Sequence, residues 1–217
     1  MPDDFLFVDR EEAALLLSKR LTGYRGSDAV VFAVPRGGVP IGAVVARELD
    51  LPLEVVLVKK LGHPVNPEFA IGSVSLRNVR IERISPDISR EFIRQETERL
   101  QQELKRRHQL FTSGRKLIPV KNRRIILVDD GIATGSTLLA AAADLRESGA
   151  SEIVVAVPVA PPGAAGMFRK ICDDYIVLYE PRDFGGVGQF YADFRQVTDE
   201  EVVDTLKSYW NRAKVPS

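Results

Sequence analysis

Short runs of apolar, largely β-branched residues alternate along the chain with segments in which apolar residues recur at helical spacing. Such runs indicate strands that are buried on both faces, and apolar residues three and four apart indicate amphipathic helices. The runs predicted as strands are 29–34, 53–58, 124–128, 152–158 and 175–179. The segments predicted as helices are 10–21, 38–49, 136–148 and 163–171. This order predicts parallel βαβ units, and therefore a doubly wound α/β fold with a mainly parallel sheet.

Two segments depart from this alternation and predict an insertion. Residues 71–84 alternate between apolar and polar positions about Arg77-Asn78, which predicts a β-hairpin that projects from the sheet. Residues 86–113 are rich in charge and predict a long helix with a sparse apolar side. This helix is either a lid or dimer arm, or a solvated surface helix. Its apolar side would consist of Phe92, Leu100, Leu104 and Leu110.

The same pattern predicts one domain over residues 1–217. Its core would span about residues 28–180 and its insertion about residues 71–116. The remaining segment, about residues 181–217, would form a C-terminal tail or small hood that ends in a short helix, 199–210. The N-terminal helix, which Asp9 would cap, is a second candidate for the hood. The tail aromatics would stack on a ligand or, as we prefer, pack the tail onto the domain. They are Phe184, Phe190, Tyr191 and Phe194.

Composition limits the class of protein. With 217 residues, 45% of them hydrophobic, the chain can bury a core without disulfides or structural metal. Basic and acidic residues number 30 each, and this balance argues against a nucleic-acid partner. The single cysteine, Cys172, excludes an internal disulfide, and its apolar neighbours favour a buried thiol over a nucleophile. Because the N-terminus is acidic and no apolar run is long enough to cross a membrane, we expect a soluble cytoplasmic protein.

One segment combines the residue types that a ribose phosphate needs. The strand at 124–128 ends in Asp129 and Asp130, and a loop rich in glycine and hydroxyl groups then leads into the helix 136–148. Ligands of open α/β sheets bind beyond the carboxyl ends of the strands. The unpaired amides at a helix start suit a phosphate, while ionised carboxylates accept hydrogen bonds from adjacent sugar hydroxyls. Phosphate beside a diol describes a ribose 5-phosphate.

A purely structural interpretation of this segment is the alternative. Ser136 or Thr137 would then only cap a helix, and Asp129 and Asp130 would be polar residues at a strand end. The loop is neither GxxxxGK[ST], because it lacks a lysine, nor GxGxxG. The pair of acids before the loop is what makes the ribose-phosphate interpretation specific.

The segment resembles the signature of the type I phosphoribosyltransferase family, in which four apolar residues, two acids and a loop ending in T-G-x-T follow one another. Residues 125–130 and Thr134-Gly135-Ser136-Thr137 match it, and the order of elements is similar over about residues 30–179. The resemblance implies that Asp129 and Asp130 hold the ribose hydroxyls. It also implies that the loop holds the 5-phosphate, through Ile132, Ala133, Thr134, Gly135, Ser136 and Thr137.

Two further segments would bind pyrophosphate. Arg36-Gly37-Gly38 follows the first strand, with a guanidinium for phosphate oxygens and glycines for unusual backbone geometry. In the family the corresponding loop binds pyrophosphate, often with a strained non-proline peptide. Lys59-Lys60 ends the strand 53–58 and resembles the family's pyrophosphate-contacting lysine. Because strand side chains alternate, only one lysine would face the cleft, and we favour Lys60. The alternatives are an ordinary turn with a surface arginine, and two solvated lysines.

Neither histidine is a strong candidate for the chemistry. The segment 61–72 corresponds to the position of a mobile catalytic loop in the family, and His63 lies within it. A lone loop histidine is more often incidental than catalytic. We expect His108, on the charged helix, to be solvated.

The resemblance implies transfer of ribose 5-phosphate from phosphoribosyl pyrophosphate to a nitrogen acceptor, a nucleobase above all, with release of pyrophosphate. Mg²⁺ would be held mainly by substrate, with Asp129 and Asp130 close by and Arg36 and Lys60 assisting. Ala133 departs from the 6-oxopurine members, which place an aspartate there to handle a purine proton. A hypoxanthine–guanine enzyme of the usual pattern is therefore disfavoured.

Two other functions stay open at this stage. The first is a catalytically weak or inactive regulatory protein that senses ribose phosphates or nucleotides with the same loop. The second, weaker one is another sugar-phosphate enzyme on the same architecture, because architecture does not determine chemistry. We also expect a homodimer, with the long helix as a candidate interface, since symmetric homodimers are common.

Overall fold

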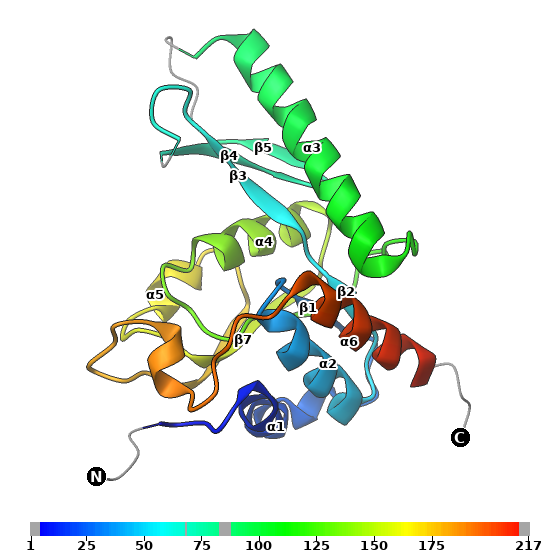
Figure 1. Cartoon of the computed structure of the whole chain (residues 1–217), viewed down its shortest axis with the longest axis vertical. Coiled ribbons are helices and arrows are strands. Elements are labelled where there is room, and N and C mark those ends of the chain that lie inside the picture. The colour runs from blue at the N-terminus through cyan, green and yellow to red at the C-terminus, as the bar shows by residue number, and fades with distance from the viewer. Residues whose placement is uncertain (1–4, 68, 83–87, 213–217) are drawn as a thin grey trace.

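The body of the protein is a five-stranded parallel sheet with helices on both faces (Figure 1). The computed structural model describes residues 5–67, 69–82 and 88–212. The strands, in the order β2-β1-β6-β7-β8, are β2 (Leu53–Val55), β1 (Val30–Ala33), β6 (Arg124–Val128), β7 (Glu152–Val159) and β8 (Asp174–Tyr179). The helices of the body are α1 (Arg10–Arg20), α2 (Gly38–Leu49), α4 (Ser136–Glu147), α5 (Ala165–Phe168) and α6 (Asp199–Arg212). The predicted doubly wound α/β fold is confirmed.

The apolar strands separate two hydrophobic cores. Successive side chains of a strand point to opposite faces of the sheet. In β6, Ile126 and Val128 therefore belong to the core beneath α1, α2 and α6. Ile125 and Leu127 belong to the second core, beneath α4 and α5. These four residues have no exposed surface, which explains the continuous apolar run in the sequence.

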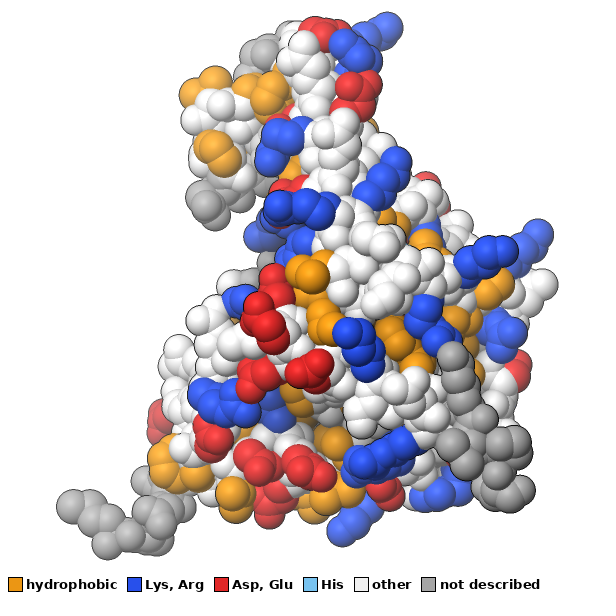
Figure 2. Space-filling model, turned by 45° about the vertical axis from the view of Figure 1, so that its right-hand side comes forward, with side chains coloured by type: hydrophobic (Ala, Val, Ile, Leu, Met, Phe, Trp, Pro, Cys, Tyr) orange, Lys and Arg blue, Asp and Glu red, His pale blue; other side chains and the backbone are white. Residues whose placement is uncertain are grey.

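An arm projects from this body (Figure 1). It is an antiparallel sheet of β3 (Val58–Gly62), β4 (Ala70–Ser75) and β5 (Val79–Ile81), together with α3 (Arg90–Thr112). The space-filling view shows the surface indented between the hairpin end of the arm and the body (Figure 2). The predicted hairpin is confirmed by β4 and β5, although residues 83 and 84 of the predicted range lie outside the described residues.

The long helix α3 is packed against the rest of the molecule on one side. Leu100 and Leu104 are buried as predicted, but Phe111 is buried in place of Leu110, which is 50% exposed. Residues 104 and 111 are two helical turns apart and share a face, whereas residue 110 is turned away from it. The helix is therefore not a fully solvated one. His108 is correspondingly half-buried, and burial lowers the pKa of its imidazole, in contrast to the expected solvation.

Two predicted elements are wrong in extent. The strand predicted at 53–58 ends at Val55, and after Val56 and Leu57 the chain enters β3 of the arm. Both intervening residues are buried, so the apolar run continues across the boundary and periodicity cannot reveal the break. The helix predicted at 163–171 is only the single turn of α5.

The segment before α1 and the segment 190–195 before α6 pack together as a small hood. Phe7 forms a parallel β-bridge with Tyr191. The amide of Ala192 donates to the carbonyl of Phe7 at 2.9 Å, and that of Asp193 donates to the carbonyl of Val8 at 2.8 Å. Phe190 and Tyr191 are buried, so these tail aromatics pack the tail onto the domain. Among the described residues, no helix is both long and apolar enough to cross a membrane.

Candidate functional site

The predicted loops lie at the point where the strand order of the parallel sheet reverses. β1 and β6 are adjacent and parallel, and their register ends with Ala33 opposite Val128. The chain leaves β1 for α2 and leaves β6 for α4, and these helices cover opposite faces of the sheet. A crevice opens beyond the strand ends at such a reversal, and it is where ligands bind in doubly wound folds. The two motifs found in the sequence therefore flank the expected ligand site.

The two loops touch, and glycine is required where they do. A Cβ atom on Gly37 would lie 2.0 Å from Oδ2 of Asp130, and one on Gly38 would lie 2.9 Å from Cα of Asp129. A side chain at residue 37 would displace the carboxylate of Asp130, and one at residue 38 would push against the backbone of Asp129. The peptide bond between Pro35 and Arg36 is cis, a non-proline geometry of the kind that the resemblance implies for this loop.

The adjacent acids are buried and tied into the structure. Oδ1 of Asp129 accepts a hydrogen bond from the amide of Asp130 at 2.9 Å. Burial, together with the negative charge of Asp130, raises the pKa of Asp129 well above its usual range. Burial also raises the pKa of Asp130, and the guanidinium of Arg10 opposes this rise. Arg10 donates to Oδ2 of Asp130 from Nε at 3.0 Å and from Nη2 at 2.9 Å.

The loop before α4 presents backbone amides at a helix start. Gly135 is left-handed, with φ of 72°, and turns the chain into the helix. Within the described part of the chain, the amides of residues 133–137 take part in no hydrogen bond. The amide of Ile132 is different, because it donates to the carbonyl of Val159 at 2.9 Å, and its side chain is buried. Ile132 therefore anchors the loop, and its N–H is not free for the phosphate predicted there. The hydroxyls of Thr134 and Ser136 lie 3.1 Å apart.

The two lysines do not lie where the sequence predicts them. They belong to β3 of the arm, because the parallel strand ends at Val55. Lys59 points toward α3, where its ammonium group lies 2.5 Å from Glu103. Lys60 is on the other face of the strand and is exposed. Arg36 remains beside Gly37 in the loop after β1, and its guanidinium lies 3.6 Å from the carboxylate of Asp199.

Two residues of the hood reach Asp130 and a third packs on one of them, and the sequence did not single out these three as a set. Arg10 binds its carboxylate, and the hydroxyl of Tyr191 donates to its carbonyl at 2.7 Å. The ring of Phe194 lies 4.0 Å from the guanidinium carbon of Arg10. The only sequence signal was the expectation that the N-terminal helix or the aromatic tail forms a hood. No local motif links positions so far apart in the chain.

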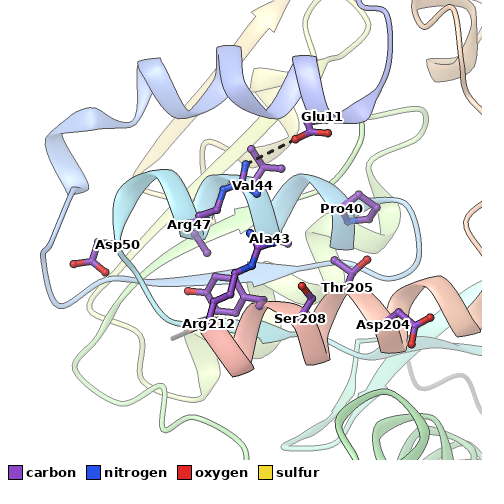
Figure 3. A pocket seen from close by; sticks show the side chains of 12 residues that line it. Glu11, Pro40, Ala43, Val44, Arg47, Asp50, Asp204, Thr205, Ser208 and Arg212 are labelled. Carbon is purple, nitrogen blue, oxygen red and sulfur yellow. Dashed lines mark ion pairs between the residues drawn. The ribbon is translucent and has the colours of Figure 1, made fainter. Parts of the chain in front are cut away.

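A cavity of about 420 Å³ opens between the hood and the two loops. Its lining residues are Arg10, Arg36, Gly37, Asp130, Phe194, Gln196 and Val197. A second cavity, of about 600 Å³, lies between α2 and α6 and is bordered by Glu11 of α1, which pairs with Arg47 at 3.9 Å (Figure 3). None of its lining residues belongs to the loops after β1 or β6. The smaller cavity therefore coincides with the candidate site.

The remaining candidate groups have structural contacts. His63 accepts a hydrogen bond at Nδ1 from the amide of Val65 at 3.2 Å, within the β3–β4 connection. The thiol of Cys172 donates to the carbonyl of Phe168 at 3.2 Å, and burial raises its pKa, as expected for an unreactive cysteine. Within residues 5–67, 69–82 and 88–212, no three or more His, Cys, Asp and Glu side chains form a group that could hold a metal ion.

Comparison with known proteins identifies the family. Residues 10–195 match the family described as the phosphoribosyl transferase domain, and the chain therefore belongs to it. This agrees with the resemblance seen in the sequence.

Individual relatives agree with this assignment. The proteins named "Putative phosphoribosyl transferase Rv0571c" and "Putative phosphoribosyl transferase MT0597", from two strains of Mycobacterium tuberculosis, are each 41% identical over 207 residues. That alignment covers 93% of this chain but only 46% of each relative, so the chain spans about half their length. The crystal structure of TT1426 from Thermus thermophilus matches with a TM-score of 0.83 at 36% identity, over 94% of this chain and 98% of that one.

Proposed function

We propose that the protein binds phosphoribosyl pyrophosphate and transfers its ribose 5-phosphate to a nitrogen acceptor, a nucleobase above all, with release of pyrophosphate. The observation that carries the proposal is the contact between the loops after β1 and β6. Gly37 lies directly against Asp130, and Gly38 lies directly against Asp129. A Cβ atom added to either glycine would clash with the neighbouring acid. This contact supports the proposal, because it brings the loop proposed to bind pyrophosphate next to the two acids proposed to accept the ribose hydroxyls.

In this proposal the loop after β6 binds the ribose phosphate. The amides of residues 133–137 at the start of α4 hold the 5-phosphate, aided by the hydroxyls of Thr134, Ser136 and Thr137. Asp129 and Asp130 accept hydrogen bonds from the two ribose hydroxyls. Ile132 contributes only by anchoring the loop to β7.

Pyrophosphate would lie against the loop after β1. Its binding groups are the backbone of Gly37 and Gly38, the guanidinium of Arg36 and the ammonium of Lys60. Arg36 would give up its contact with Asp199 to bind pyrophosphate. That ion pair is weak, because its atoms are 3.6 Å apart and both side chains are partly exposed. Lys60 is preferred to Lys59 because Lys59 is already paired with Glu103.

The carboxylates of Asp129 and Asp130 are hard oxygen donors of the type that suits Mg²⁺. The metal, which the family generally uses with this substrate, would be held mainly by substrate oxygens with these two residues nearest to it. When bound, it supplies positive charge to the leaving pyrophosphate.

Charge stabilisation and the positioning of the two substrates would account for most of the catalysis. The bond from the anomeric carbon to pyrophosphate oxygen breaks as the bond from acceptor nitrogen to that carbon forms. Positive charge on the sugar develops beside Asp129 and Asp130, while negative charge leaves beside Arg36 and Lys60. Ala133 is exposed in the loop and cannot exchange a proton with a purine ring, so we propose an acceptor other than a 6-oxopurine handled in that way.

The first prediction tests this function directly. Pyrophosphate release should be measured with phosphoribosyl pyrophosphate, Mg²⁺ and a panel of nucleobases, for the wild type and for the Asp129→Asn/Asp130→Asn variant. We expect release with one base, reduced on the order of 10³-fold or more in the variant because two charged acceptors near the developing cation are lost.

Two results would contradict the proposed enzymatic function. Substrate binding without release on any base would favour the sensing function. Absence of binding would contradict the assignment of the loop after β6.

A further inference from the structure

Asp130 is tied to two segments distant in the chain, the start of α1 and the segment before α6. Arg10, the first residue of α1, places Nε and Nη2 at 3.0 and 2.9 Å from the same oxygen, Oδ2. Both side chains of this pair are nearly enclosed, at 11% and 15% exposure. The same oxygen lies against Gly37, where a Cβ atom would come within 2.0 Å of it. Oδ2 is therefore enclosed by protein on two sides.

The other carboxylate oxygen of Asp130 is in a different situation. Both hydrogen bonds from Arg10 end at Oδ2, and no other described residue donates to Oδ1. Asp129 also has one bonded oxygen. Its Oδ1 accepts a hydrogen bond from the amide of Asp130 at 2.9 Å, whereas no described residue donates to its Oδ2. Each acid therefore has one oxygen held by protein and one left to accept a hydrogen bond from a ligand.

Two tail residues support Arg10 and Asp130. The hydroxyl of Tyr191 donates to the carbonyl of Asp130 at 2.7 Å, and its ring is buried. The ring of Phe194 lies 5.0 Å from that of Tyr191 and 4.0 Å from the guanidinium carbon of Arg10. Nη1 of Arg10 donates to the carbonyl of Arg195 at 3.0 Å. The guanidinium thus joins the acid to the tail through planar contacts that a lysine cannot reproduce.

We propose that Arg10, Tyr191 and Phe194 are positioning residues that form a clamp on Asp130, holding Oδ2 so that Oδ1 faces a ribose hydroxyl. The inference rests on the proposed function and adds to it a residue set outside the loops that carry the family resemblance. It assigns a role to the hood: the ribose site is complete only when the start of α1 and the segment before α6 are both docked on Asp130. Pyrophosphate, for which the proposed binding groups are the loop after β1 and Lys60, has no ribose hydroxyls and should depend on the clamp less than phosphoribosyl pyrophosphate does.

The experiment compares two probes on the full chain. The affinities of phosphoribosyl pyrophosphate and of pyrophosphate alone, each with Mg²⁺, should be measured by calorimetry for Arg10→Lys and Arg10→Met. A charge-assisted, forked contact is lost in both, so we expect phosphoribosyl pyrophosphate affinity to fall on the order of tenfold in Arg10→Lys and further in Arg10→Met. Pyrophosphate affinity should fall much less than phosphoribosyl pyrophosphate affinity does.

Arg124→Lys is the matched control. Arg124 places Nε at 2.8 Å and Nη2 at 2.6 Å from a single oxygen of Asp28, the same geometry at the opposite end of β6. This variant should bind both probes as the wild type does. Tyr191→Phe keeps the buried ring and removes only the hydroxyl, and it should weaken phosphoribosyl pyrophosphate binding about threefold, as expected for one neutral hydrogen bond.

The outcomes separate the clamp from the proposed function. Wild-type protein that does not bind phosphoribosyl pyrophosphate overturns both. Wild-type binding that is unchanged in Arg10→Lys and Arg10→Met overturns the clamp alone. A parallel loss of both probes, or a loss in Arg124→Lys as large as that in Arg10→Lys, also overturns the clamp, because it would reflect general disturbance of the fold.

Discussion

The close approach of Gly37 to Asp130 shows how little space separates the two binding loops. Glycine supplies the needed room at Gly37 and Gly38, and the sequence alone suggested these glycines only as sites of unusual backbone geometry. What the sequence could not show is which atoms they approach. The acids themselves were predictable, because a carboxylate pair at the end of an apolar strand is a local pattern. Arg10 was not, since its partner is a residue of another loop.

A single added methyl group at residue 37 should therefore disable the site. In Gly37→Ala the new Cβ atom would meet Oδ2 of Asp130 at 2.0 Å, so the carboxylate must move. We expect affinity for phosphoribosyl pyrophosphate to fall on the order of a hundredfold, a larger effect than the loss of one charged hydrogen bond. Calorimetric titration would measure it.

Gly23→Ala is the matched control, because no heavy atom lies within 4 Å of its added Cβ atom. It should bind as the wild type does. Equal affinities for Gly37→Ala and the wild type would contradict the role assigned to the contact between the loops.

At the scale of the element, strand β3 determines which lysine is available. Side chains alternate along a strand, so Lys59 faces α3 and pairs with Glu103, whereas Lys60 lies on the other face. The sequence predicted the alternation and the preference for Lys60. It could not predict that β3 belongs to a separate antiparallel sheet, because residues 55–58 are apolar without interruption across the boundary between β2 and β3.

Neutralising these neighbouring lysines should have different effects. Lys60→Met should lower affinity for pyrophosphate on the order of tenfold, because a charged contact to phosphate is lost. Lys59→Met should leave that affinity unchanged and lower the free energy of unfolding by at most about 1 kcal/mol, the usual range for a partly exposed ion pair. Titration with pyrophosphate and urea denaturation would measure the two effects. If Lys59→Met lowered the affinity for pyrophosphate more than Lys60→Met does, the pyrophosphate contact would be assigned to Lys59.

At the scale of the whole molecule, a buried polar junction joins the arm to the body. Asp144 of α4 is 5% exposed and accepts hydrogen bonds from the hydroxyl of Ser75 and, at 2.9 Å, from the amide nitrogen of Asn78. Its other oxygen, Oδ2, is buried without a partner among the described residues. Nearby, the guanidinium of Arg77 lies 5.4 Å from the ring of Phe32. The turn of the hairpin is thus bound to α4, the helix that follows the glycine-rich loop after β6.

This junction predicts a dependence of stability on pH. Burial raises the pKa of Asp144 above its usual value, so folding favours the protonated carboxyl. The contribution of this carboxyl group to stability is complete below its pKa in the unfolded chain, about 3.9. It is lost as pH rises through its higher pKa in the folded protein. The free energy of unfolding of the wild type, relative to that of Asp144→Asn, should therefore fall as pH rises above about 4.

Urea denaturation at several pH values would test the junction. Asparagine does not titrate, and all other carboxyl groups are the same in the wild type and in Asp144→Asn. The effects of these other groups on the free energy of unfolding therefore cancel in the difference between the two proteins. Asp144→Ala should be less stable than Asp144→Asn by about 1–3 kcal/mol, because the hydroxyl of Ser75 and the side-chain amide of Asn78 would both lose the buried acceptor Oδ1. A difference between wild type and Asp144→Asn that does not change with pH would contradict the raised pKa.

The sequence by itself determined the alternation of strands and helices, the order of the parallel units, the hairpin, and the acid pair with its glycine-rich loop. These are local patterns, set by burial period and by the residue types that a helix start or tight turn requires. Only the tertiary structure decided that the apolar run at 53–58 divides between two sheets, that Ile132 anchors its loop, and that Arg10 and Tyr191 reach Asp130. Such contacts join segments distant in the chain, and no periodicity or spacing within one segment encodes them.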